Sequence, residues 1–223
     1  MLGKSPMNDY LSIAKDGLWS NNPALVQLLG LCPLLAVSNT FVTALGLGLV
    51  TLLVLTAANM IISLLRNLLH DAIRLPVQIL IIATLVTLAD IALQSWYFEL
   101  HQRIGLFVAL IVTNCTLLGR AEVFASRNPL LASMVDGITM GLGFLWVLLI
   151  MGAVREILGH GTLFHNFHLL FGTKDLTLHF TDTGFLLMVL PPGAFLTLGC
   201  LIALKNYMEM RLRERGKTLS VPG

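Results

Sequence analysis

The chain has 223 residues, of which 56% are hydrophobic and only 12% are charged, and its mean hydropathy is +0.84. Because ordinary globular proteins carry about 25% charged residues, this composition predicts a polytopic membrane protein and excludes a soluble enzyme, a nucleic-acid-binding protein and a disordered chain. The net charge of +2 is too small to indicate a polyanionic partner, and three cysteines cannot form the disulfide framework of a secreted domain.

Six hydrophobic segments are predicted in chain order within a single membrane domain, residues 1–223. The first 17 residues form a polar tail without the apolar core of a cleavable signal peptide. Residues 17–65 carry no formal charge, which is enough for two passes of about 20 residues each, and Pro33, Ser38 and Asn39 mark the break between them. Pro191 and Pro192 should break or kink the sixth segment. The predicted segments are residues 23–37, 41–65, 75–96, 104–119, 130–154 and 183–204.

The Lys and Arg residues predict the orientation of these segments. An even number of crossings returns the chain to its starting side. With the amino terminus inside, all but three of the 14 Lys and Arg residues fall in cytoplasmic stretches, the exceptions being Arg103, Arg155 and Lys174. Cytoplasmic loops of membrane proteins are enriched in Lys and Arg. Both termini are therefore expected in the cytoplasm.

The first and fourth segments are short and similar to each other. About 15 helical residues reach only some 22 Å of a roughly 30 Å hydrocarbon core, so both should be half-helices, broken or re-entrant. Each has the pattern Cys-x-Leu-Leu-small, at residues 32–36 and 115–119, and each half then has a Gly-Leu-Gly step, at 46–48 and 141–143. We interpret residues 20–98 and 104–206 as two three-helix repeats. Because three crossings is an odd number, the repeats have inverted topology.

Inverted repeats should bring Cys32 and Cys115 to the same depth near the bilayer midplane. Thiolates select iron–sulfur clusters, Zn or Cu(I). A lone membrane cysteine more often packs as a small hydrophobe, but two at equivalent repeat positions favour a ligand role. A disulfide between them is the alternative. Cys200 has no repeat partner and is predicted to be a core residue.

Two thiolates supply half of the four that a [2Fe–2S] cluster normally takes. The other two would come from a homologous subunit of opposite orientation, which would place the cluster between the subunits. Electron tunnelling weakens steeply with distance, so a centre in mid-membrane divides one long step into two shorter ones. This hypothesis assigns electron conduction across the bilayer to the pair of cysteines.

Four stretches of the chain resemble a known family, the E subunit of the Rnf electron-transport complex, which is also called the ion-translocating oxidoreductase complex. The stretches are residues 22–37 (NPALVQLLGLCPLLAV), 110–122 (LIVTNCTLLGRAE), 155–164 (REILGHGTLF) and 190–195 (LPPGAF). The resemblance extends over nearly the whole chain. The related D subunit of the Na+-translocating NADH:quinone oxidoreductase is the close alternative, and the last two stretches favour the Rnf protein.

The resemblance implies an all-α, six-helix protein of the bacterial inner membrane that pairs with an inverted homologue, the A subunit, and shares a [2Fe–2S] cluster with it. Cys32 and Cys115 would then be the two ligands from this chain. The complex of this family, with further subunits B, C, D and G, couples electron transfer to movement of Na+ or H+. No independent catalytic site, flavin attachment motif or nucleotide site is expected on this chain.

Other polar residues are weaker candidates. An ionisable residue inside a membrane segment is a candidate for function, so Asp136 and Asp90 are candidates for an ion path, although we favour positions within two turns of an interface. Arg120 and Glu122 either pair with each other or, as we favour, mark the cytoplasmic surface. Four histidines of the outer loop fit no regular metal-ligand spacing and are interpreted as solvated: His160, His165, His168 and His179.

Two other classes of protein are weighed against this interpretation. A secondary transporter can also be built from inverted repeats with broken helices, but it would need polar or charged ligands at the breaks. Here the breaks carry Cys, Pro, Thr and Asn. A purely structural membrane scaffold is the third class, and it predicts that replacing either cysteine leaves electron transfer intact.

Overall fold

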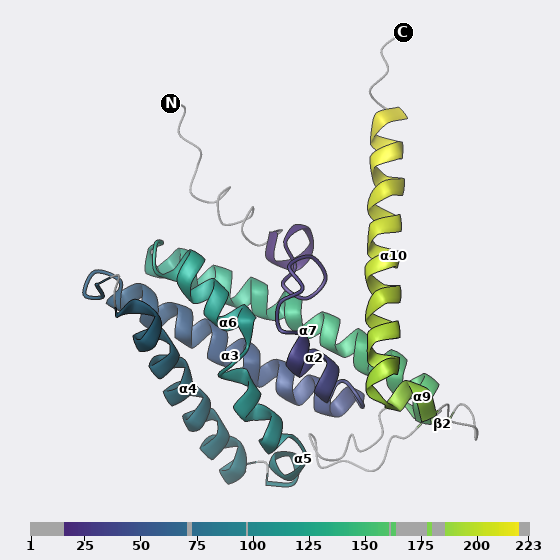
Figure 1. The fold of residues 1–223 in the computed structure, drawn as a ribbon, viewed down its shortest axis with the longest axis horizontal. Coiled ribbons are helices and arrows are strands. Elements are labelled where there is room, and N and C mark those ends of the chain that lie inside the picture. Colours follow the sequence, from purple (N-terminus) through teal and green to yellow (C-terminus); the bar gives the residue numbers. More distant parts are fainter. Residues whose placement is uncertain are drawn as a thin grey trace.

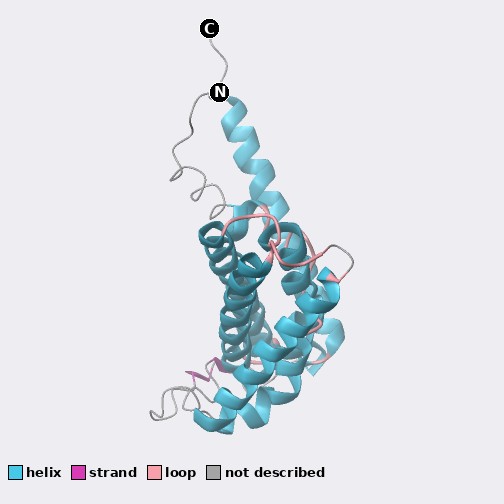
Figure 2. Cartoon of the chain, turned by 90° about the vertical axis from the view of Figure 1, so that its left-hand side faces the viewer, coloured by secondary structure: helices cyan, strands magenta, loops and turns pink. Residues whose placement is uncertain are grey.

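The computed structural model describes residues 16–70, 73–96, 98–160, 162–163, 178–179 and 186–218. Predictions for the amino-terminal tail up to residue 15, for His165 and His168, and for the start of the sixth segment lie outside these ranges. The described elements are helices, joined by loops and turns, and two paired strands of two residues each (Figures 1 and 2). The fold class predicted from the sequence, an all-α membrane protein, is therefore confirmed at that level.

The elements follow one another along the chain with few long connections between described residues. They are η1 (Asp16–Ser20), α2 (Leu31–Val37), α3 (Phe41–Leu65), α4 (Arg74–Trp96), α5 (Phe98–Val108), η2 (Ala109–Ile111), α6 (Cys115–Arg120), η3 (Ala121–Ala125), α7 (Leu130–His160), β1 (Thr162–Leu163), β2 (Leu178–His179), α9 (Leu186–Val189) and α10 (Pro191–Thr218). The strands are antiparallel, with Thr162 opposite His179 and Leu163 opposite Leu178.

The centre of the fold is the antiparallel pair α3 and α7. Glycines of α7 face α3 closely: a Cβ at Gly137 would lie 2.8 Å from the Cα of Thr56, and one at Gly141 would lie 3.1 Å from the Cα of Leu52. Small residues let helix backbones approach in a membrane, where packing rather than the hydrophobic effect holds helices together. Both helices are 56% buried over their most apolar windows, whereas α4 is only 17% buried and is therefore peripheral.

Two clusters of buried apolar side chains surround this pair. One joins α3 to α4, α5 and α6 and includes Leu55, Ile82 and Leu117. The other joins α7 to α2 and to the first part of α10, and includes Leu34 and Phe144. The remainder of α10 extends beyond the other helices (Figures 1 and 2).

Four helical stretches of the described chain are long and apolar enough to cross a membrane: Phe41–Leu65, Arg74–Trp96, His101–Ala125 and Leu130–Gly159. The first predicted segment, residues 23–37, is helical only over α2. The apolar part of the sixth is divided between α9 and α10, which begins at Pro191. The arrangement of six segments in two inverted repeats stays a prediction.

Two predicted boundaries need correction. The fourth segment, expected to have 16 residues at 104–119, belongs to a 25-residue apolar stretch that is interrupted just before Cys115. The fifth, expected to end at residue 154, continues as α7 to His160. Arg155, assigned to an outer loop from the sequence, is therefore inside a helix and only 1% exposed. Its charge is accommodated there by hydrogen bonds to α2 and α9.

Candidate functional site

Both candidate cysteines lie in the first turn of a short helix. Cys32 is the second residue of α2, and Cys115 is the first residue of α6. Both are exposed on this chain and neither forms a disulfide. Both short helices lie against the α3–α7 pair, as the arrangement in Figure 1 shows. The helix breaks predicted at both cysteines are therefore present.

The residues that precede the two cysteines meet. Gly30 has a φ of 72°, a left-handed conformation that glycine adopts without strain. A Cβ at Gly30 would lie 2.8 Å from Oδ1 of Asn114 and 2.9 Å from Oγ1 of Thr116, so this position has no room for a side chain. We name this contact of Gly30 with Asn114 and Thr116 the cysteine crossing.

Asn114 starts α6 by capping it. Its backbone is extended, with φ −69° and ψ 115°, and its Oδ1 accepts a hydrogen bond of 2.9 Å from the backbone N–H of Thr116. A side-chain acceptor of this kind satisfies one of the free N–H groups at a helix start. The Nδ2 of Asn114 and the Oγ1 of Thr116 are buried and have no hydrogen-bond partner within the described chain.

Arg155 of α7 fixes the far end of α2. Its guanidinium donates to Oγ of Ser38 at 2.8 Å and to the carbonyl of Leu35 at 3.3 Å. The same guanidinium donates to the carbonyls of Met188 at 3.1 Å and Val189 at 2.7 Å. These carbonyls lie just before Pro191 and Pro192, which have no N–H to donate within a helix. The guanidinium of Arg155 therefore donates to carbonyls that lack helical N–H partners at the break before Pro191, and it links α2 to α9.

The next residue on α7 holds the start of α3. Glu156 is fully buried, and its Oε2 accepts a hydrogen bond of 2.7 Å from the backbone N–H of Phe41. Phe41 is the first residue of α3. A negative charge at this end of a helix is favourable because the helix dipole is positive there. Arg155 thus contacts the connection between α2 and α3 at its α2 end, and Glu156 contacts it at its α3 end.

A second charged pair fixes the far end of α6. Arg120 forms a two-pronged ion pair with Asp136 of α7, in which Nε donates to Oδ2 at 3.0 Å. Asp136 is buried, and Nδ2 of Asn59 in α3 contacts its Oδ2 at 3.4 Å. The guanidinium also lies 4.9 Å from the ring centre of Phe124. Thus α7 contacts a side chain or carbonyl at the carboxyl end of each cysteine helix.

The other charged candidates have partners that the sequence did not indicate. Arg120 and Glu122 do not pair with each other: Glu122 accepts from Arg74 of α4, with Nε to Oε2 at 2.9 Å. Asp90 lies 3.2 Å from Nδ1 of His101, and its side chain is 39% exposed. Asp136 is therefore paired with Arg120, and Asp90 lies beside His101; neither carboxylate is among the residues of the cysteine crossing.

Two further expectations concern ligands. Cys200 is exposed on α10, so the prediction that it is a core residue is wrong. Among the described residues, no three His, Cys, Asp or Glu side chains come together to hold a metal ion. A cluster with four protein ligands would therefore need ligands from outside this part of the chain.

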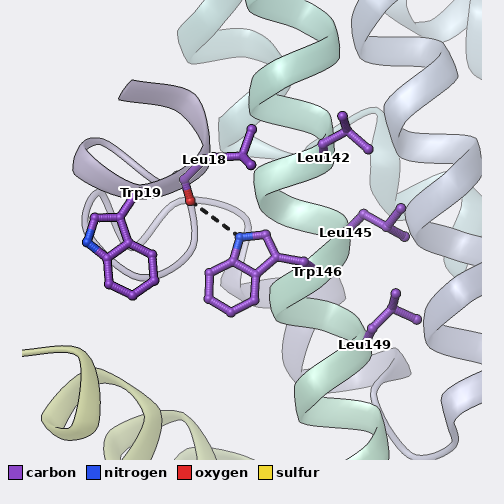
Figure 3. Close-up of a pocket in the computed structure, with 6 residues that line it drawn as sticks. All are labelled: Leu18, Trp19, Leu142, Leu145, Trp146 and Leu149. Atoms are coloured by element: carbon purple, nitrogen blue, oxygen red, sulfur yellow. Dashed lines mark hydrogen bonds between the residues drawn. The ribbon is translucent and has the colours of Figure 1, made fainter. Parts of the chain in front are cut away.

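An apolar hollow of about 470 Å³, which no cysteine lines, lies between η1 and α7 (Figure 3). Trp19 and Trp146 stack beside it with their ring centres 6.3 Å apart, and the indole N–H of Trp146 donates to the carbonyl of Leu18 at 3.4 Å. Four leucines complete its lining with no ionisable group: Leu18, Leu142, Leu145 and Leu149. The hollow therefore offers no group for acid–base chemistry or for ligation.

Sequence reasoning missed the polar groups that support the cysteine helices. Asn114 could have been recognised as a helix cap, because Asn next to a new apolar run is a helix-start signal. A charged pair usually ends a membrane segment, so the sequence predicts Arg155 and Glu156 in a loop. Arg155 is buried because carbonyls of α2 and α9 accept from it, and Glu156 because the backbone N–H of Phe41 in α3 donates to it. These partners are remote in the sequence, so no local pattern indicates them.

The chain matches known proteins over most of its length. A family model described as "Rnf-Nqr subunit, membrane protein" matches residues 10–202. A Pseudomonas aeruginosa protein, named as the E subunit of an ion-translocating oxidoreductase complex, is 53% identical over 213 residues, which is 94% of this chain and 90% of that protein. Proteins with the same name from Thioalkalivibrio sulfidiphilus (53% identical, 92% of each chain) and Shewanella loihica (52% identical, 96% of this chain and 94% of the relative) are similar.

Proposed function

The chain belongs to the Rnf-Nqr family of membrane subunits, and we propose that it is the E subunit of an ion-translocating oxidoreductase complex. In this proposal it supplies Cys32 and Cys115 to a [2Fe–2S] cluster shared with a second subunit. It has no catalytic site of its own. The name shared by relatives at 52–53% identity favours this assignment over the D subunit of a Na+-translocating NADH:quinone oxidoreductase.

The cysteine crossing is the observation that carries the proposal. Two segments remote in sequence meet at Gly30, and each begins a short helix with an exposed cysteine. Exposed thiols in a protein this apolar are available to a ligand or a partner rather than to the chain's own core. Two soft ligands suit iron–sulfur chemistry, and the count of two suits a site that is completed by another subunit.

The residues of this chain fit such a group in two respects. Cys32 and Cys115 provide thiolate ligands, and both side chains are exposed where a partner can reach them. The contacts of α7 at the ends of α2 and α6 fix the helices that carry the ligands. When bound, the cluster would take up and release one electron inside the bilayer, so that transmembrane transfer proceeds in shorter steps.

The proposed partner is an inverted homologue, the A subunit of the same complex, which would bring two further cysteines. The remaining subunits B, C, D and G would complete the pathway in the bacterial inner membrane, with both termini of this chain in the cytoplasm. Electron transfer would be coupled to movement of Na+ or H+. Asp136 is engaged by Arg120, which makes it a structural residue in this state, while Asp90 is the more exposed candidate for contact with an ion.

Iron analysis and electron paramagnetic resonance of the purified complex test the proposal. The three cysteines provide a matched set, because all are exposed but only Cys32 and Cys115 lie at the crossing. We expect Cys32→Ser and Cys115→Ser each to remove the [2Fe–2S] signal and its iron. Cys200→Ser should retain both. A signal that survives unchanged in both crossing variants would end the proposal.

A further inference from the structure

A pocket of about 280 Å³ lies where α2, α3 and α5 meet, and it has an apolar wall and a polar side. The apolar wall is formed by Ala36 and Val37 of α2 and by Phe107 of α5. The polar side is formed by α5 and by the residues at the start of α3: Asn39, Thr40, Thr43 and Arg103. One cationic side chain and no acidic one line this pocket, so it suits an anion that also carries an apolar group.

Arg103 supplies the positive charge of the pocket. Its side chain is exposed, and no described residue forms an ion pair or a hydrogen bond with it. The side chain of Asn39 is also exposed and makes no hydrogen bond with the described chain. Glu156 does not line the pocket, because it is fully buried and accepts from the N–H of Phe41. The charge of Arg103 is therefore uncompensated by the residues around it.

The pocket lies at the level of the bilayer surface. The spanning helix α3 begins at Phe41, the spanning helix α4 ends at Trp96, and the apolar stretch that follows begins at His101, two residues before Arg103. Because α3 and α4 run in opposite directions, these ends lie on the same side (Figure 1). Trp96 is 81% exposed, and tryptophans of membrane proteins are enriched at the level of the lipid headgroups. The anions at this level are the phosphates of phospholipids.

We propose that this pocket binds the headgroup of an anionic phospholipid, with the lipid phosphate at Arg103 and the start of the acyl chains beside Phe107. A guanidinium pairs with phosphate through two parallel hydrogen bonds. An anionic headgroup is favoured over a zwitterionic one, because no carboxylate lines the pocket to pair with an ammonium or choline group. The bound lipid would connect α5 to the end of α2, the helix that carries Cys32. This site goes beyond the proposed function and does not depend on the iron–sulfur cluster.

Native mass spectrometry of the purified full chain in detergent measures this preference. The chain is titrated with phosphatidylglycerol or with phosphatidylcholine of identical acyl chains. We expect the wild type to bind phosphatidylglycerol about tenfold more tightly, the size expected for a hydrogen bond to a charged group. Arg103→Gln should lose this difference. Arg66→Gln is the matched control and should keep it, because Arg66 lies at the opposite end of α3 and does not line the pocket.

Asn39→Asp tests the same pocket without altering Arg103. It adds a carboxylate that repels phosphate, so it should also abolish the preference, and both replaced side chains are exposed. Inorganic phosphate, which has no acyl chain, should not displace the lipid at millimolar concentration.

Three results would overturn the inference. The first is equal affinity of the wild type for the two lipids, or a preference that survives in both Arg103→Gln and Asn39→Asp. The second is an equal loss of preference in Arg66→Gln, because binding would then follow net charge rather than the pocket. The third is displacement by inorganic phosphate, which would assign the pocket to the free anion.

Discussion

Replacement of Arg155 by methionine tests the claim that α7 holds the carboxyl end of the first cysteine helix. Methionine keeps much of the apolar stem and removes the guanidinium. Three of the hydrogen bonds that the Arg155 guanidinium donates are 3.1 Å or shorter, to Ser38, Met188 and Val189. Interhelical hydrogen bonds in membranes contribute about 0.6 kcal/mol on average and up to about 1.7 kcal/mol each. Loss of three therefore predicts a destabilisation of about 2–5 kcal/mol.

Equilibrium unfolding in mixed micelles of increasing SDS content measures this loss. Arg211→Met is the matched control, since Arg211 is exposed and its guanidinium contacts Tyr207 of its own helix, with the guanidinium carbon 5.2 Å from the ring centre. The control should change the unfolding free energy by less than about 1 kcal/mol, as exposed contacts do. Equal unfolding midpoints for the two variants would refute the assigned role of Arg155.

Two further changes probe the crossing and the second charged pair. Gly30→Ala places a Cβ on a left-handed backbone and against Asn114, which should cost about 1–2 kcal/mol in strain alone and reduce the iron retained by the purified complex. Gly199→Ala is the control, because its Cβ would lie in open space, and it should retain wild-type iron. Equal iron in the two variants would argue against a close crossing. Asp136→Asn leaves Arg120 without its buried counter-charge and should destabilise the chain by about 3–5 kcal/mol in the same SDS assay. Asp90→Asn is the control, because Asp90 is partly exposed beside His101, and it should cost under about 1 kcal/mol. Similar losses for the two variants would contradict the structural role assigned to Asp136.

The long helices were predictable because their signal is local. Residues 41–65 are predicted and observed as one helix, since an uninterrupted apolar run bounded by Thr40 and Arg66 needs no information from elsewhere in the chain. The breaks at Cys32 and Cys115 were also predictable in place. Pro33 and Asn114 are local signals of a helix start, although the apolar stretch around Cys115 is longer than the sequence suggests.

The supports of the cysteines were not predictable because they are made by distant parts of the chain. Arg155 contacts residues that are 117 and 34 positions away, and no local pattern indicates that Ser38 and Val189 converge on it. Sequence reasoning treats a charge after an apolar run as the end of a membrane segment. In this fold, carbonyls freed at Pro191 and Pro192 make the interior favourable for the guanidinium, so α7 extends past it.

An anomalous-scattering map of the intact complex would locate the iron. We predict an iron peak beside the cysteine crossing, bonded to the sulfur atoms of Cys32 and Cys115 and to two cysteines of a neighbouring subunit. Iron absent from this place, or bound without these two sulfur atoms, would contradict the proposed ligation.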